Sequence, residues 1–211
     1  MAAVKICGIT NWTDAKAAID AGADALGFNF YAKSPRRITV ARARGIVRHM
    51  PRDVSAVGVF VNASIADILK TAHGVKLGVL QLHGEESPTT VKELARDFPV
   101  IKAFRIGPSF HIKDLEKYSS ASAFLLDGFD RKLRGGTGKK FDWRIVKRAK
   151  RFGPVILAGG IVKENAAKAI RTANPFAIDV CSGVERSPGR KDRKKMREFM
   201  AAVERMRAEN E

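Results

Sequence analysis

A thiol and a carboxylate lie near the ends of two apolar stretches that have the composition of buried strands. Cys7 lies in AVKICGI, and Asp127 follows FLL and precedes a glycine. A thiol becomes a usable base or nucleophile when nearby cations lower its pKa from about 8.5, and Lys5 is on the same face of the strand. A carboxylic acid at a strand end can deliver a proton. The two residues predict acid–base chemistry, although a buried apolar cysteine and a loop ion pair for the aspartate are open alternatives.

Two further stretches end in polar side chains that could contact a ligand. LQLHGEE has Gln81 and His83 on one face, and NFYAKSPRRIT contains Arg36 and Arg37. A guanidinium binds a carboxylate through two parallel hydrogen bonds, so either arginine could hold an anionic substrate; solvated side chains are the alternative. No second histidine or carboxylate stands at ligand spacing from His83, so we predict no metal site.

Two pairs of small residues predict a phosphate site. Gly159 and Gly160 occur in LAGGI, and Ser182 and Gly183 occur in DVCSGVE. Small residues let backbone N–H groups approach a phosphate closely. In parallel barrels the loops after the seventh and eighth strands, with a short helix N-terminus, often form such a site.

A long basic loop follows Asp127. Its sequence, DRKLRGGTGKKFDW, contains Gly135, Gly136 and Gly138. Glycines combined with positive charge are typical of a mobile lid over an anionic ligand, and simple loop flexibility is the alternative. The loop is no P-loop, because the Lys-Ser/Thr ending is absent.

Eight β-rich stretches alternate with amphipathic segments of helical length. The stretches are rich in Val, Ile and Phe, as buried parallel strands are; they cover residues 3–9, 24–30, 54–61, 77–84, 99–106, 123–129, 154–161 and 176–184. Predicted helix N-caps are Asn11 or Thr13, Ser64, Ser87 before a proline, and Asp142. The last helix is predicted from about residue 190 to residue 208.

These eight strand–helix pairs predict one architecture. Parallel strands joined by right-handed helical crossovers suit an α/β fold, a compact (β/α)8 TIM barrel of eight parallel strands. No linker or low-complexity tract divides the chain, so residues 1–211 are predicted to form a single barrel domain. A doubly wound open sheet is the alternative, but the first strand–helix turn, CGITNW, lacks the G-x-G-x-x-G fingerprint.

Composition narrows the class of protein. The 211 residues contain 39 Lys+Arg and 22 Asp+Glu, a net charge of +17, with two cysteines. No run of about 18 apolar residues could cross a membrane, no signal peptide is recognisable, and two cysteines make no disulfide framework, so we expect a cytoplasmic protein. The charge favours anionic ligands and, nonspecifically, nucleic acid. No specific nucleic-acid partner is predicted, because no binding signature accompanies the charge.

The motifs together resemble one family, the phosphoribosylanthranilate isomerases of tryptophan biosynthesis. The matching segments run in order over almost the whole chain: KICGIT, GADALGFNFYAKSPRRIT, GVFVN, LQLHGEE, LLD followed by GGTGKKFDW, LAGGI with EN after it, and DVCSGVE followed by PGRKD. The resemblance implies the Amadori rearrangement of N-(5′-phosphoribosyl)anthranilate, a small phosphorylated substrate, to 1-(o-carboxyphenylamino)-1-deoxyribulose 5-phosphate. It implies no cofactor, and a monomer or homodimer is expected.

The resemblance also assigns roles to residues. It makes Cys7 the general base and Asp127 the general acid, and it places Arg36 on the anthranilate carboxylate. Arg37, where many members have tyrosine, is the alternative contact. It also implies that Asp179 lies by the substrate and that the phosphate is bound at Gly159, Gly160, Ser182 and Gly183. Gln81 and His83 are predicted as substrate contacts from their position at a strand end.

Cys181 stands where the family more often has a small hydroxyl residue. Because the first and eighth strands are neighbours in a closed barrel, Cys7 and Cys181 are expected to approach each other, and oxidation could join them. The nearest rival function is the related isomerase of histidine biosynthesis, which would be expected to have an aspartate in place of Cys7 and a second phosphate site in the first half. Another barrel enzyme of the tryptophan pathway and a basic nucleic-acid-binding module are further alternatives.

Overall fold

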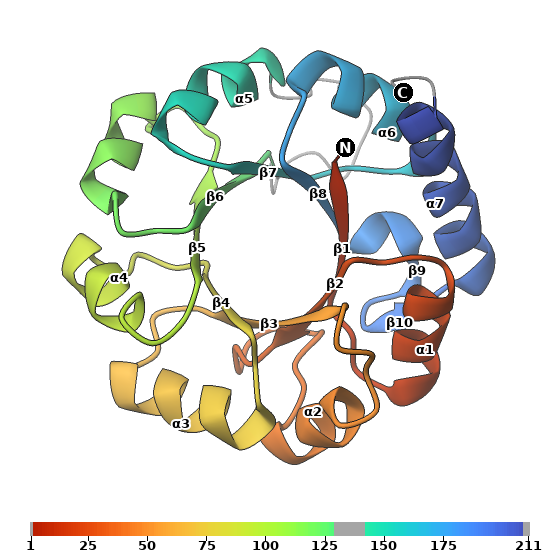
Figure 1. Ribbon diagram of the computed structural model, residues 1–211, viewed down its shortest axis with the longest axis horizontal. Helices are drawn as coiled ribbons and strands as arrows, with labels where there is room; N and C mark the ends of the chain where they lie inside the picture. The colour runs from red at the N-terminus through yellow and green to blue at the C-terminus, as the bar shows by residue number, and fades with distance from the viewer. Residues whose placement is uncertain (1, 129–141, 209–211) are drawn as a thin grey trace.

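Eight parallel strands form a closed barrel in which each strand pairs with its neighbours in chain order, and the first strand pairs with the eighth (Figure 1). The structure is a computed structural model that describes residues 2–128 and 142–208. The strands are β1 (Ala3–Cys7), β2 (Ala25–Asn29), β3 (Ser55–Phe60), β4 (Val79–Leu82), β5 (Val100–Arg105), β6 (Ala123–Asp127), β7 (Val155–Ala158) and β8 (Ala177–Val180). The predicted (β/α)8 barrel is confirmed, and the open sheet is wrong.

Helices surround the barrel as an outer ring (Figure 1). They are α1 (Trp12–Asp20), α2 (Val40–Val47), α3 (Ile65–Val75), α4 (Pro88–Leu94), α5 (Arg144–Ala149), α6 (Lys163–Ala173) and α7 (Arg193–Ala208). Three predicted N-caps are confirmed: the side chains of Asn11, Ser64 and Ser87 each accept a hydrogen bond from the backbone N–H three residues on. Such caps satisfy backbone donors that the first helical turn leaves without a partner.

Three details of the connections differ from the prediction. The segment between β5 and β6 forms a 3-10 helix, η1 (Ile112–Tyr118), where an α-helix was expected. Asp142 is no N-cap, because its Oδ1 accepts from the N–H of Arg144, only two residues on, as in an Asx turn. The last helix begins at Arg193 because Arg190–Lys191 (β10) pairs antiparallel with Glu185–Ser187 (β9).

The apolar core has two parts. The larger part lies between the strands and the helices. A smaller cluster includes Val57, Ile101, Leu125, Ile156 and Ala177, all of which belong to strands. Because side chains alternate along a strand, the residues in step with this cluster face the barrel interior. In the part of the chain that the structure describes, no helix is long and apolar enough to cross a membrane.

Candidate active site

Most of the predicted site residues lie on the inward faces of strands or just beyond the strand ends. Asp127 lies two residues after Leu125 on β6, and Asp179 lies two residues after Ala177 on β8. Each therefore points to the same, inward face as that residue. Cys7 closes β1. All parallel strands point the same way, so their carboxyl ends share one mouth of the barrel, where barrel enzymes place their chemistry.

A buried ion pair forms the floor of this mouth. The Nζ atom of Lys5 lies 2.8 Å from Oδ1 of Asp179, and the two side chains are 3% and 9% exposed. Burial raises the pKa of Asp179 to about 6, even though Lys5 opposes this shift. Burial disfavours the charge on Lys5, but Asp179 and Cys7 outweigh it and raise the pKa of Lys5. Both groups are therefore charged at neutral pH, and Lys5 supplies a fixed positive charge below the thiol.

The Cys7 thiol is buried and forms a hydrogen bond with Cys181. This bond lowers the pKa of Cys7 well below that of an ordinary thiol; burial opposes the shift, and the positive charges of Lys5 and Lys191 add to it. The same bond, together with burial, raises the pKa of Cys181. The shifts favour ionisation of Cys7 over ionisation of Cys181, and the predicted approach of the two cysteines is observed.

Gly27 makes the room that the Cys7 side chain occupies. A Cβ atom at this position would lie 2.7 Å from Sγ of Cys7 and 3.1 Å from Nζ of Lys5. Gly27 is the register partner of Cys7 on β2. A glycine here is therefore a condition for placing a thiol and an ammonium side by side.

Asp127 contacts His83 across the mouth. Its Oδ2 lies 3.4 Å from Nε2 of the imidazole, and both side chains are about one-fifth exposed, at 19% and 20%. The Gln81 amide nitrogen lies 2.9 Å from Nδ1 of His83. In this orientation the amide nitrogen donates to Nδ1, which assigns to a neutral ring the tautomer with its proton on Nε2, toward Asp127. Among the described residues, Oε1 of Gln81 is buried without a hydrogen-bond partner, so an unused acceptor lies inside the barrel.

Asp127 and Cys7 both influence the buried carboxyl group of Asp179. Each of them contributes to the raised pKa of Asp179. Asp179 is on β8, which pairs with β1 on one side and with β7 on the other. The acid and the base predicted from the sequence thus face a common interior, and the partial exposure of Asp127 leaves it accessible from the mouth.

Of the two neighbouring arginines, Arg36 is the one that lies at the mouth. A Cβ atom on Gly8 would lie 2.8 Å from Cδ of Arg36 and 3.1 Å from Sγ of Cys181, so the Arg36 stem passes beside the thiols. Arg37 is exposed and lines an outer pocket of about 600 Å³ with residues of α1 and α2. The guanidinium of Arg36 forms an ion pair with Glu185.

The two glycines after β7, which are predicted to bind phosphate, have backbone conformations that favour glycine. Gly159 and Gly160 have φ angles of +86° and +64°, a region that favours glycine. A Cβ on Gly160 would meet no heavy atom within 4 Å, so open space lies above it, whereas a Cβ on Gly159 would lie 2.7 Å from Oδ1 of Asp127. The loop after β7 therefore lies directly against the predicted acid.

The loop after β8 packs closely on the loop after β7. A Cβ on Gly183 would lie 2.1 Å from the carbonyl oxygen of Ile161, so only glycine allows this approach. Ser182 begins the 3-10 helix η3 (Ser182–Val184). Asn165 ties the start of α6 to the same place: its Oδ1 accepts from Val162 N–H and its amide donates to the Gly160 carbonyl. Two loops and a helix N-terminus thus converge here, as phosphate sites in such barrels do.

The sequence alone did not reveal the roles of four residues at the site, and one prediction falls on residues that the structure does not describe. Glu185 and Lys191 lie in the motif SGVE…PGRKD, which was recognised without a role for either residue. Gly27 and Asn165 carry no chemistry of their own, and only the structure shows what they make room for or hold. Residues 130–141 of the predicted lid, which include its three glycines, lie outside the described residues.

The fold and the site define the class: a (β/α)8-barrel protein with a buried thiol, carboxyl groups, an arginine and glycine-containing loops at the carboxyl ends of its strands. The family model for N-(5′-phosphoribosyl)anthranilate isomerase matches residues 4–202. The chain belongs to this family.

Individual relatives agree with this assignment. The N-(5′-phosphoribosyl)anthranilate isomerase of Geobacter metallireducens is 47% identical over 200 residues, which cover 95% of this chain and 98% of the relative. A phosphoribosyl anthranilate isomerase crystallised with reduced 1-(o-carboxyphenylamino)-1-deoxyribulose 5-phosphate superposes with a TM-score of 0.87 and 38% identity, covering 97% of this chain and 99% of the other. Monomers generated from the dimeric enzyme of Thermotoga maritima give a TM-score of 0.84 at 38% identity, with coverage of 97% and 99%.

Proposed function

We propose that this chain catalyses the rearrangement of N-(5′-phosphoribosyl)anthranilate to 1-(o-carboxyphenylamino)-1-deoxyribulose 5-phosphate in tryptophan biosynthesis, with Cys7 as base and Asp127 as acid. The observation that carries the proposal is the placement of a low-pKa thiol and a partly exposed carboxyl group on the inner face of one barrel mouth. The family to which the chain belongs and the relative crystallised with the reduced product support the choice of substrate.

The acid acts first. Asp127 donates a proton to the ring oxygen of the ribose as the C1–O bond breaks, and the nitrogen lone pair forms the iminium ion. His83, 3.4 Å from Asp127, holds the carboxyl group in place. The open space above Gly160, next to Asp127 through Gly159, lets the phosphate bind close to the acid.

The base acts second. The Cys7 thiolate removes the proton from C2, and the C2–H electrons form the C1–C2 double bond while the iminium nitrogen becomes an amine. The resulting enolamine then tautomerises to the ketone, with the proton returning at C1. A thiolate suits this step because Cys181 and Lys5 lower the pKa of Cys7, and general base catalysis of this kind contributes about 10² to 10⁴ in rate.

The two ends of the substrate carry negative charge, and the site has a partner for each. Arg36, beside the thiols, is proposed to bind the anthranilate carboxylate. The phosphate is proposed to bind at Gly159, Gly160, Ser182 and Gly183. Gln81 and Asp179, which line the interior between these ends, are proposed to contact the sugar.

The direct test measures the loss of anthranilate fluorescence when purified protein is added to N-(5′-phosphoribosyl)anthranilate. We expect a loss that is first order in enzyme and absent when boiled protein is used. The histidine-pathway substrate is the comparison: turnover of that substrate alone would overturn the proposal. Binding to nucleic acid with a steep salt dependence, without any turnover, would favour the basic-module alternative.

We further propose a single domain over residues 1–211, a cytoplasmic location and a monomeric or homodimeric state. The closed barrel supports the single domain. The use of a reduced thiol as the base supports the cytoplasmic location. The dimeric Thermotoga maritima relative supports the homodimer as one of the two states. Light scattering of the purified protein decides between monomer and dimer.

A further inference from the structure

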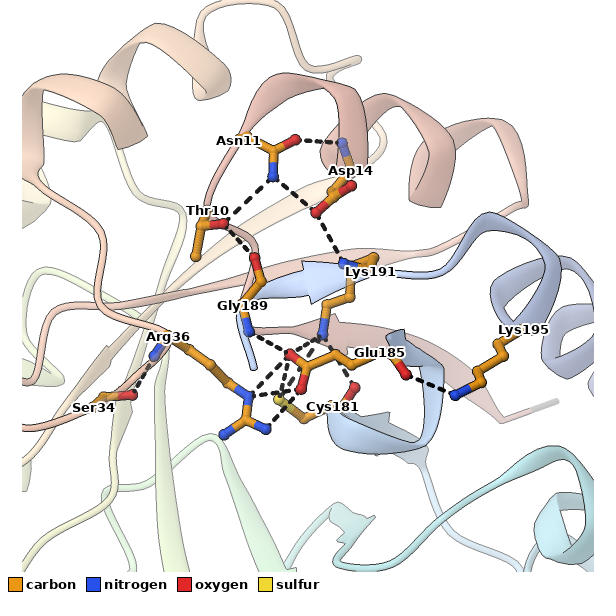
Figure 2. Close-up of polar contacts among 10 residues, drawn as sticks. All are labelled: Thr10, Asn11, Asp14, Ser34, Arg36, Cys181, Glu185, Gly189, Lys191 and Lys195. Carbon is orange, nitrogen blue, oxygen red and sulfur yellow. Dashed lines mark hydrogen bonds and ion pairs between the residues drawn. The ribbon is translucent and has the colours of Figure 1, made fainter. Parts of the chain in front are cut away.

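Glu185 is a buried carboxylate that the mechanism above does not use. Its side chain is 4% exposed and lies at the start of β9, just beyond the end of β8. Burial raises the pKa of Glu185, but hydrogen bonds and charges from Arg36 and Lys191 outweigh burial and keep its pKa below the ordinary value. Figure 2 shows this carboxylate at the centre of a polar cluster that contains Arg36, Cys181 and Lys191.

The two oxygens of Glu185 occupy one edge of the Arg36 guanidinium. Nε donates to Oε1 at 2.9 Å, and Nη2 donates to Oε2 at 2.7 Å. A guanidinium has a second edge, formed by Nη1 and Nη2, that can bind another carboxylate through two parallel bonds. With the first edge taken, only this second edge can present two donors to a substrate.

Glu185 is itself held rigidly from the other side. Its Oε1 also accepts from Nζ of Lys191 at 3.1 Å and from the N–H of Gly189 at 3.2 Å. The backbone N–H of Lys191 in turn donates to Oδ2 of Asp14 in α1 at 2.9 Å. The position of the Arg36 head group is thus fixed by contacts that reach from the barrel mouth to the outer helices.

Glu185 is shared between two cations. It accepts from Arg36 and from Lys191, and the second edge of the Arg36 guanidinium keeps two donors for a further carboxylate. Without Glu185, the Arg36 side chain would lose its orientation and could also be drawn toward other acceptors.

We propose that Glu185 is a positioning residue that determines specificity for the carboxylate of the substrate, by holding one edge of Arg36 so that the other edge faces the ligand. The inference rests on the proposed function and adds a residue to it. It assigns Glu185 no contact with the reacting atoms. The effect of Glu185 should therefore depend on whether the substrate has a carboxylate.

The test compares two substrates with wild-type protein and with the Glu185→Gln and Glu185→Asp variants. One substrate is N-(5′-phosphoribosyl)anthranilate, and the other is the aniline analogue, which lacks only the carboxylate. Gln removes the charge at similar size, and Asp keeps the charge but shortens its reach. Asp20→Asn, which removes an exposed partner of Lys16 on α1, is the matched control.

For both Glu185 variants we expect KM for the anthranilate substrate to rise roughly tenfold or more, because a charge-assisted pair is lost, with kcat within about threefold. For the aniline analogue, kcat/KM should change less than about twofold in the same variants. Adding Arg36→Ala to Glu185→Gln should not further lower kcat/KM for the anthranilate substrate relative to the aniline analogue, because the two residues act as one unit.

Two results would overturn the inference: an equal loss on both substrates, as a purely structural role predicts, or an unchanged KM for the carboxylated substrate. If Glu185→Gln does not fold, Glu185→Asp decides the question, because it keeps the ion balance with Lys191. Wild-type turnover is measured in the same experiment, so an inactive wild-type protein would count against the proposed function and not against the role of Glu185.

Discussion

Replacing Cys181 by alanine should make the Cys7 thiol a weaker acid and shift the pH dependence of the enzyme. The hydrogen bond from Cys181 is the largest influence that lowers the pKa of Cys7. Hydrogen bonds to charged groups contribute about 1.5 to 3 kcal/mol, and a thiol is a weak donor, so the lower end applies. At 1.36 kcal/mol per pKa unit, the pKa of Cys7 should rise by roughly one unit. The Lys5 and Lys191 charges remain in the variant and continue to lower the pKa of Cys7.

The assay is the pH profile of kcat/KM, followed by loss of anthranilate fluorescence. The base must be a thiolate, so activity rises as pH increases through the pKa of Cys7; a higher pKa moves this acidic limb to higher pH. We expect Cys181→Ala to move the limb upward by roughly one pH unit, and Cys181→Ser, which keeps a hydroxyl donor, to move it less. An ultraviolet titration of the thiolate should show the same shift. An unchanged limb in Cys181→Ala would refute the reasoning that the second thiol tunes the first.

Further predictions concern the acid, the base and the space between them. Cys7→Ser should lower kcat by about 10² to 10⁴ with KM nearly unchanged, and parental kcat would end the assignment of the base. Asp127→Asn should lower kcat over a similar range; single-turnover measurements that show an unimpaired ring-opening step would remove Asp127 from the role of acid. Gly27→Ala would place a Cβ 2.7 Å from Sγ of Cys7, so the thiol must move and kcat should fall by roughly 10² with the circular dichroism spectrum preserved, whereas full activity would mean that the thiol position is not critical.

The sequence predicted the barrel because its signals were local and repeated. Each of the eight β-rich stretches contains a strand, and caps such as Ser64 and Ser87 were recognisable from single residues. The connection at η1 was less predictable. Its seven residues form 3-10 turns, and a hydrophobic pattern does not distinguish these from a short α-helix. The start of α7 depended on β10 pairing with β9, a contact between segments that no periodicity signals.

Site residues could be predicted from the sequence where their function follows from their position at a strand end. Cys7 and Asp127 are the last residues of β1 and β6, the two glycine-containing loops follow β7 and β8, and the barrel brings strand ends together. Glu185 lies in a recognised motif, but its role depends on Arg36, which is 149 residues away in sequence. The donor role of Cys181 likewise depends on which thiol the cations favour, and that follows from three-dimensional placement of Lys5 and Lys191.

The most direct test of the central claim is a crystal structure of this protein with reduced 1-(o-carboxyphenylamino)-1-deoxyribulose 5-phosphate bound. The account predicts that C2 of the sugar lies within about 3.5 Å of Sγ of Cys7, a distance suited to reaction, with Asp127 on the opposite side of the sugar chain and the carboxylate on Arg36. A ligand whose C2 lies far from Cys7, or whose sugar contacts only one of the two residues, would contradict it.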